Sequence, residues 1–184
     1  ASVVQIDASA ARTLTSAAAF TADASSNIAS ISLNNGSDTV TIISGNDGNV
    51  DLATLSDDAS GGTAASLTIT SEGGINYTSI NLNDTTDGAL SLTVDSDNAD
   101  GEVETLTITN NISNVGSILL SGGYGADSDD IIDINIDLTS TNGGITVQNA
   151  DSVKIDDGLT LDSQNGDIAV HSNVDGVLLD GNAN

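Results

Sequence analysis

The feature that most constrains the fold is a phrase that recurs along the chain: an apolar residue, Thr and another apolar residue, followed within a few residues by Ser and then by Asn or Gly. Six copies begin at Val40, Leu67, Leu92, Ile118, Ile136 and Leu159. The last two match without a gap from Leu138/Leu161 to Val147/Val170, at a strict offset of 23 residues. A period of this length is typical of a solenoid, in which each copy forms one coil stacked on the next.

The residues available for a core are almost all aliphatic. The chain has no Cys, Met, Pro or Trp, two Tyr and one Phe. From Ile28 onward nearly every segment alternates apolar and polar residues between Gly, Asn and Asp turns, which indicates strands. Strands stacked about 4.8 Å apart bury aliphatic residues in narrow ladders. We therefore predict a single-domain, all-β parallel β-solenoid (β-helix) of about seven coils.

Residues 1–27 differ from the rest of the chain. The Ala-rich stretch 8–24 favours a short helix, so we predict an N-terminal arm or cap over 1–27 and the solenoid repeat domain over 28–184. The repeat pattern continues to Leu179 without a visible cap, which predicts an open end. The alternative fold is an antiparallel β-sandwich whose N-terminal arm, starting at Val3, donates a strand to the next subunit.

The chain is strongly acidic, with a net charge of −25 from 27 acids against Arg12 and Lys154. Self-repulsion of this size destabilises a compact state unless cations or high salt screen it. Because phosphate binding needs clustered Lys and Arg, we expect no nucleic-acid partner. No stretch approaches the roughly 20 apolar residues of a membrane helix, so we expect no membrane insertion. The chain opens with Ala1, from which we expect a processed, secreted protein or an excised segment.

Two acidic segments are candidate calcium sites. The first supplies carboxylates at Asp95, Asp97, Asp100 and Glu102 around a Gly, and alternate residues of a loop can present several oxygen ligands to calcium. The second, with Asp127 and Asp129, starts like the calcium-binding nonapeptide of secreted repeat proteins, although Asp129 stands where that repeat has an aliphatic residue. The competing interpretation of both segments is a solvated acidic turn.

Catalysis is not expected. His171 is the only imidazole, and adjacent acids such as Asp156 and Asp157 point to opposite faces of a strand. The Thr-x-Thr steps at Thr39/Thr41 and Thr68/Thr70 suggest an ice-binding solenoid as an alternative, but the Thr array is ragged in the later copies.

The segment 136–179, with its NGGITV and NGDIAV phrases, resembles coils of filamentous-haemagglutinin-type adhesins. The acidic, Lys-poor, Thr-rich composition is similar to that of bacterial surface-layer and type I-secreted repeat proteins. The resemblance implies export, a cell-surface or matrix role and no cofactor beyond calcium.

We therefore predict a secreted structural protein that forms a homopolymer through end-to-end contacts, as an extracellular filament, surface layer or adhesin stalk. Calcium or salt would screen its acidic surface. The alternative from another class is a monomeric, calcium-dependent, ligand-binding adhesin module with an unknown surface ligand.

Overall fold

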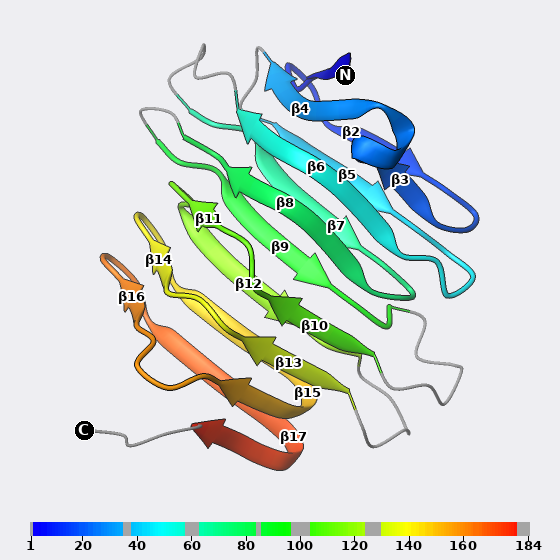
Figure 1. The fold of residues 1–184 in the computed structure, drawn as a ribbon. Helices are drawn as coiled ribbons and strands as arrows, with labels where there is room; N and C mark the ends of the chain where they lie inside the picture. Colours follow the sequence, from blue (N-terminus) through cyan, green and yellow to red (C-terminus); the bar gives the residue numbers. More distant parts are fainter. Residues whose placement is uncertain are drawn as a thin grey trace.

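The computed structural model describes residues 2–34, 38–57, 63–83, 86–96, 104–123 and 130–179. Every strand pairing within these ranges is parallel, and the strands stack into a β-solenoid of about six turns (Figure 1). The predicted all-β parallel solenoid is therefore confirmed. The alternative antiparallel sandwich is wrong, because a sandwich of that kind requires antiparallel neighbours.

Each turn passes through three sides, which we name in chain order. The first side holds β2 (Arg12–Thr15), β5 (Thr39–Ile43), β7 (Ser66–Thr70), β9 (Ala89–Thr93), β12 (Ser117–Ser121) and the starts of β15 (Ile145–Ile155) and β17 (Ile168–Leu179). The second side holds β3 (Phe20–Ala22), the starts of β6 (Val50–Asp57) and β8 (Ile75–Asn81), β10 (Thr105–Ile108), β13 (Ile131–Ile134) and the ends of β15 and β17. The third side holds β1 (Ser2–Asp7), β4 (Ile28–Asn34), the ends of β6 and β8, β11 (Ile112–Ser113), β14 (Leu138–Ser140) and β16 (Leu161–Ser163).

Ladder pairing joins equivalent residues of successive coils into sets that we call columns. One column of the first side runs through Val40, Leu67, Leu90, Ile118, Ile145 and Ile168. Its members up to Ile145 are at most 2 % exposed. Successive strand residues point to opposite faces, so this column and its inward neighbours form the aliphatic core.

The strict offset of 23 residues between the last two copies is confirmed, because Leu138 pairs with Leu161 and Ile145 with Ile168. The common register assigned to all six copies is wrong. Leu67 pairs with Leu90, two residues before the assigned Leu92. The phrases starting at Ile136 and Leu159 lie at a different corner, because their strands β14 and β16 are on the third side.

The Ser of the repeated phrase stabilises the corners of the coils. Ser71 Oγ lies 2.8 Å from Ser44 Oγ and donates to the carbonyl of Gly48, in the preceding coil, at 2.9 Å. At the other corner Ser163 Oγ donates to the carbonyls of Gly143 and Gly166 at 2.9 and 2.8 Å. These hydroxyls satisfy carbonyls that the turns leave outside the strand ladders.

Glycines allow the corner backbones to approach. A Cβ on Gly116 would overlap the carbonyl oxygen of Asp87 in the coil above, and a Cβ on Gly143 would lie 2.8 Å from the Cβ of Ser117. A side chain at either position would therefore push two coils apart, which explains why Gly follows the polar residues of the phrase.

The N-terminal segment is not helical, which contradicts the short helix expected over 8–24. β2 pairs with β5 and β3 pairs with β6, and the only helical turn in residues 2–34 is the 3-10 turn η1 (Ala24–Ser26). Ladder hydrogen bonds and the half-buried Phe20 outweigh the helix propensity of Ala. The strands of residues 2–27 thus continue the same stack as the strands of 28–179. The prediction of seven coils was too high because β1 and β17 each fill only part of a turn.

Candidate functional site: the two ends and an acidic corner

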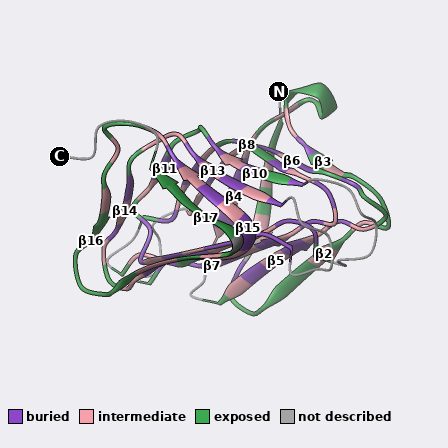
Figure 2. Ribbon diagram, turned by 90° about the horizontal axis from the view of Figure 1, so that it is seen from below, coloured by how far each residue is buried: buried purple, intermediate pink, exposed green. Residues whose placement is uncertain are grey.

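The C-terminal end of the stack exposes strand edges. β16 pairs with β14 on one side and β17 pairs with β15 on one side, and no described strand lies beyond them. Figure 2, seen from below, shows β17 largely exposed and the strands behind it largely buried. Of the five large apolar side chains that are exposed in the described part of the chain, four are on β17: Ile168, Val177, Leu178 and Leu179.

Three of these four side chains end core columns. Val177 pairs with Val153, which pairs with Ile132, and both partners are fully buried. Leu179 ends the column of Ile155 in the same way, and Ile168 ends the column of Ile145. Their exposed fractions are 42 %, 55 % and 46 %. They are exposed because no further coil covers them within the described residues.

Leu178 has the opposite orientation. It pairs with Lys154, whose partner in the next coil is Asp133, so it belongs to an outward column. Lys154 Nζ lies 3.6 Å from Asp133 Oδ1 and 3.5 Å from Asp156 Oδ1. The charge of Asp133, followed by that of Asp156, raises the pKa of Lys154 above its usual value. The outer surface of this side is therefore charged, whereas its interior is aliphatic.

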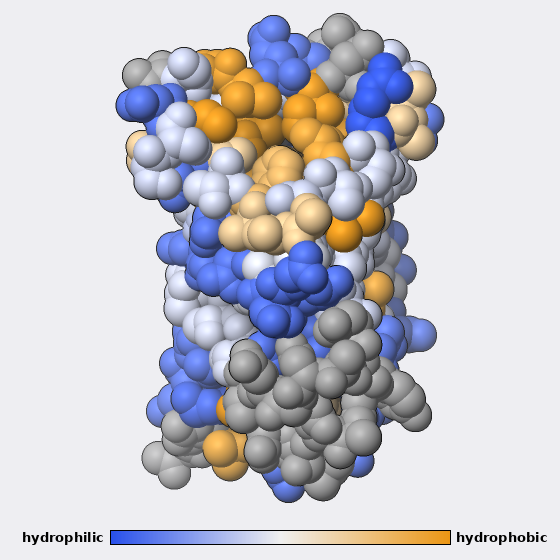
Figure 3. Space-filling view, turned by 90° about the vertical axis from the view of Figure 1, so that its right-hand side faces the viewer, coloured by the Kyte–Doolittle hydropathy of each residue, from blue (hydrophilic) through white to orange (hydrophobic). Residues whose placement is uncertain are grey.

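The N-terminal end of the stack also exposes edges. β1, β2 and β3 each pair with one strand, and the described residues place no strand on their outer side. Their inward apolar side chains are only partly buried: Val4, Ile6, Leu14 and Phe20. In Figure 3 apolar side chains gather at the top, over the N-terminal coils, above a hydrophilic middle. Both ends thus present open edges bordered by unfinished aliphatic columns.

An acidic corner lies inside the stack, between the first and second sides. Its carboxylates belong to Asp95, Glu104, Asp130 and Asp151, which are 2 to 8 % exposed. A Cβ on Gly123 would overlap Asp95 Oδ2 and lie 2.6 Å from Asp130 Oδ2, so these two carboxylates converge on one glycine. The backbone N–H of Glu104 donates to Asp130 Oδ1, and that of Asp130 donates to Asp151 Oδ2, both at 3.3 Å.

Of the predicted calcium ligands, Asp95 is among the described residues, and it lies in this corner. Asp97, Asp100, Glu102, Asp127 and Asp129 lie outside the described residues. Among the described residues no group of three or more His, Cys, Asp or Glu side chains has the geometry to hold a metal ion. Asp95 has a positive φ of 45°, which turns the chain sharply after β9.

Sequence reasoning missed Glu104, Asp130 and Asp151 as partners of Asp95, because they come from three different coils. Described residues that border the two predicted calcium segments meet at this corner. Ser96 and Glu104 flank the first segment, and Gly123 and Asp130 flank the second. One signal in the sequence points to this arrangement, because Glu104 and Asp130 each directly precede an apolar strand, β10 or β13.

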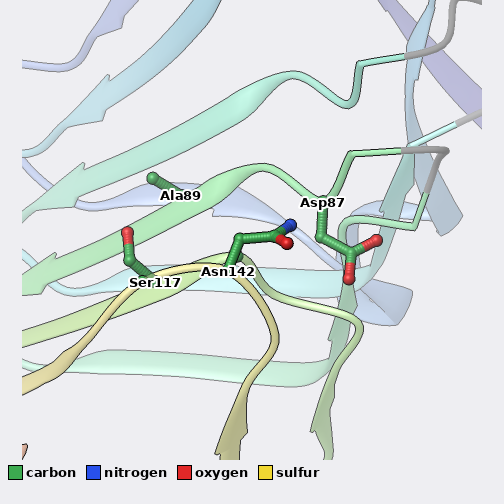
Figure 4. A pocket seen from close by; sticks show the side chains of 6 residues that line it. Asp87, Ala89, Ser117 and Asn142 are labelled. Atoms are coloured by element: carbon green, nitrogen blue, oxygen red, sulfur yellow. The ribbon is translucent and has the colours of Figure 1, made fainter. Parts of the chain in front are cut away.

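The described surface has a shallow depression of about 230 Å³ lined by Asp87, Ala89, Gly116, Ser117, Asn142 and Gly143. It lies where the two glycines remove side chains from the corner (Figure 4). Its single carboxylate, Asp87, accepts a hydrogen bond of 2.6 Å from Thr141 Oγ1. This depression therefore follows from the close approach of the coils, and its lining includes one carboxylate.

The hydroxyl array behind the ice-binding alternative is partly regular. One outward column of the first side contains Thr13, Thr41, Thr68, Ser91, Leu119, Thr146 and Ala169. Leu119 interrupts the hydroxyls, and Ala169 ends the column. The neighbouring column is also mixed, because Ile43 stands between Thr15 and Thr70.

No family model, curated protein or solved structure matches this chain. In the described part of the chain no helix is both long and apolar enough to cross a membrane.

Proposed function

We propose that this chain is a secreted structural protein whose copies stack end to end into an extracellular filament or stalk. The observation that carries the proposal is that, within residues 2–179 as described, both ends of the stack show parallel strand edges with one neighbour and partly exposed core columns. An uncovered β-edge is a template for another strand. In a parallel stack every coil offers the same kind of edge, so the N-terminal end of one copy matches the C-terminal end of another.

This contact is heterologous, because it joins two different surfaces of the same chain. Heterologous contacts that do not close into a ring produce open filaments. Stacking by translation along the solenoid axis does not close, so the product is a filament of unlimited length.

Charge would regulate the assembly. Each copy adds a formal charge of −25 to the filament, and this repulsion acts between neighbours within a Debye length of about 8 Å at physiological salt. We propose that calcium or high salt lowers this barrier. The sequence favours calcium as the more specific agent, because the two acidic segments predicted to bind it include or adjoin the buried carboxylates Asp95, Glu104 and Asp130 in the chain.

Sedimentation velocity in three buffers tests the proposal: calcium, magnesium at equal ionic strength, and dilute sodium chloride with a chelator. We expect large assemblies in calcium, fewer in magnesium and mainly monomers in dilute chelator, with filaments visible by negative-stain electron microscopy. Monomers in every buffer would contradict the proposal and favour a monomeric adhesin module. Equal assembly in all buffers would support the filament but contradict the proposed role of charge screening.

A further inference from the structure

We propose that two stacked copies share one composite coil, in which β17 of one copy supplies the first and second sides and β1 of the next copy supplies the third. This inference rests on the proposed end-to-end assembly and names its contact. The last described coil has a first and a second side, both within β17. The stack begins with a single third-side strand, β1. Within the described residues, the C-terminal coil therefore shows two sides, and the N-terminal end shows one strand of the third.

The register of the third side shows where β1 would lie. Ladder pairs join Val4 to Ile31, Leu55, Ile80 and Ile112 in successive coils. The neighbouring inward column continues from Val115 through Ser140 to Ser163. Leu161 precedes Ser163 by two residues, and Ile112 precedes Val115 by three, with a positive φ at Asn114 that takes up the extra residue. We infer from this spacing that Leu161 continues the Val4 column. In the composite coil Val4 of the next copy covers Leu161, and Gln5 lies beside Asp162.

The first side gives a consistent register. Arg12, Thr13 and Leu14 start the columns that end at Ile168, Ala169 and Val170. Placing β2 of the next copy on β17 therefore covers Ile168, which is 46 % exposed, with the aliphatic part of Arg12. Leu14 covers Val170 in the same step.

Polarity also fits at one outward position of this junction. Arg12 starts the inward column of Val40, so in this register its aliphatic stem covers Ile168 and its guanidinium has to reach the surface to stay hydrated. Gln5 and Asp162 are both exposed and outward in the single copy. Side by side, the Gln5 amide donates to the Asp162 carboxylate, which stabilises one register against a shift of one residue.

The composite coil sets the axial repeat of the filament. Six full turns and one shared turn give seven strand layers per copy, a rise of about 34 Å at about 4.8 Å per layer. If the two partial coils occupied separate layers, eight layers would give a rise of about 38 Å.

Engineered disulfides test the composite coil, because the natural chain has no Cys. We combine Gln5→Cys and Asp162→Cys in one chain. Within one copy these positions are six strand layers apart, about 29 Å, far beyond the reach of a disulfide. In the composite coil they are direct neighbours. Gln5→Cys with His171→Cys is the matched control, because His171 is exposed at the same end but lies on the first side.

A second pair separates this inference from the proposed function. Thr13→Cys with Ala169→Cys reports the stacking of β2 on β17. After mild oxidation in calcium we expect a ladder of multimers on a reducing-agent-free denaturing gel for this pair and for the Gln5/Asp162 pair, and monomers for the control pair. Filaments with a Thr13/Ala169 ladder and no Gln5/Asp162 ladder would overturn the composite coil and retain the end-to-end assembly. The absence of filaments and of both ladders would overturn both.

Discussion

Replacing Val177 by Lys places a charge at the open end of a core column. Val177 pairs with Val153, and the column continues through Ile132 to Leu106, all fully buried. Val177 is 42 % exposed, because only one of its two neighbouring layers is present among the described residues. In a single copy the Lys amine reaches water through this open end. In a filament the next copy closes over it.

The expected effect follows from the exposed fraction. Full burial of a Val side chain contributes about 1.5–3 kcal/mol, so covering the exposed 42 % contributes about 1 kcal/mol to each junction. A Lys loses this contribution and adds the cost of enclosing an amine, about 2 kcal/mol or more. A total of about 3 kcal/mol corresponds to a rise of the critical concentration on the order of 100-fold.

The assay is the concentration of unpolymerised protein left in the supernatant after assembly in calcium and centrifugation. Leu178→Lys is the control, because it adds the same charge one residue away on the outward column of Lys154. We expect the control to change the critical concentration by less than about 3-fold, since an exposed Lys stays hydrated. The melting temperatures of both variants should stay close to that of the parent. Equal critical concentrations for the parent and Val177→Lys would refute the role of this column in assembly.

Three further predictions concern the interior of the stack. Ser71→Ala removes the hydroxyl that donates to the carbonyl of Gly48 at 2.9 Å. We expect the free energy of unfolding, measured with urea, to fall by about 1–2 kcal/mol. An unchanged urea midpoint would show that this hydroxyl does not stabilise the corner. Burial raises the pKa of Tyr77 above its ordinary value of 10.0. The contribution of the neutral Tyr77 side chain to the stability of the folded state is therefore complete below pH 10.0 and is lost as the pH rises further. Tyr77→Phe should therefore flatten the fall in melting temperature above that pH, and parallel profiles of parent and variant would contradict the assignment. Asp130→Asn reduces repulsion with Asp95 at Gly123, so we expect a higher melting temperature in chelator and a smaller increase on adding calcium. A lower melting temperature of the variant in chelator, or an undiminished rise of its melting temperature on adding calcium, would contradict the proposal that calcium relieves carboxylate repulsion at the acidic corner.

The fold class could be predicted from the sequence because both the alternation of apolar and polar residues and the repeat spacing correspond directly to the observed strands and their pairing. The common register could not, since a shift of two residues leaves the same side chains facing inward. Leu90 and Leu92 are both buried, at 1 % and 0 % exposed, and nothing local distinguishes them. The coil length also varies, because Leu67 to Leu90 spans 23 residues and Leu90 to Ile118 spans 28.

The candidate sites depended on contacts between coils. Asp95 stood out in the sequence because it opens a dense acidic segment. Glu104, Asp130 and Asp151 did not, because only the stacking of successive coils brings them together at one corner. The short helix expected over 8–24 was wrong for a related reason. Ala propensity is local, whereas pairing of β2 and β3 with later strands is not.

Cryo-electron microscopy of the protein assembled in calcium is the most direct test of end-to-end stacking. We expect filaments in which strand layers about 4.8 Å apart continue without a break from one copy into the next, with a rise of about 34 Å per copy. Dispersed monomers under these conditions, or filaments joined through the sides of the solenoid with both ends uncovered, would contradict it.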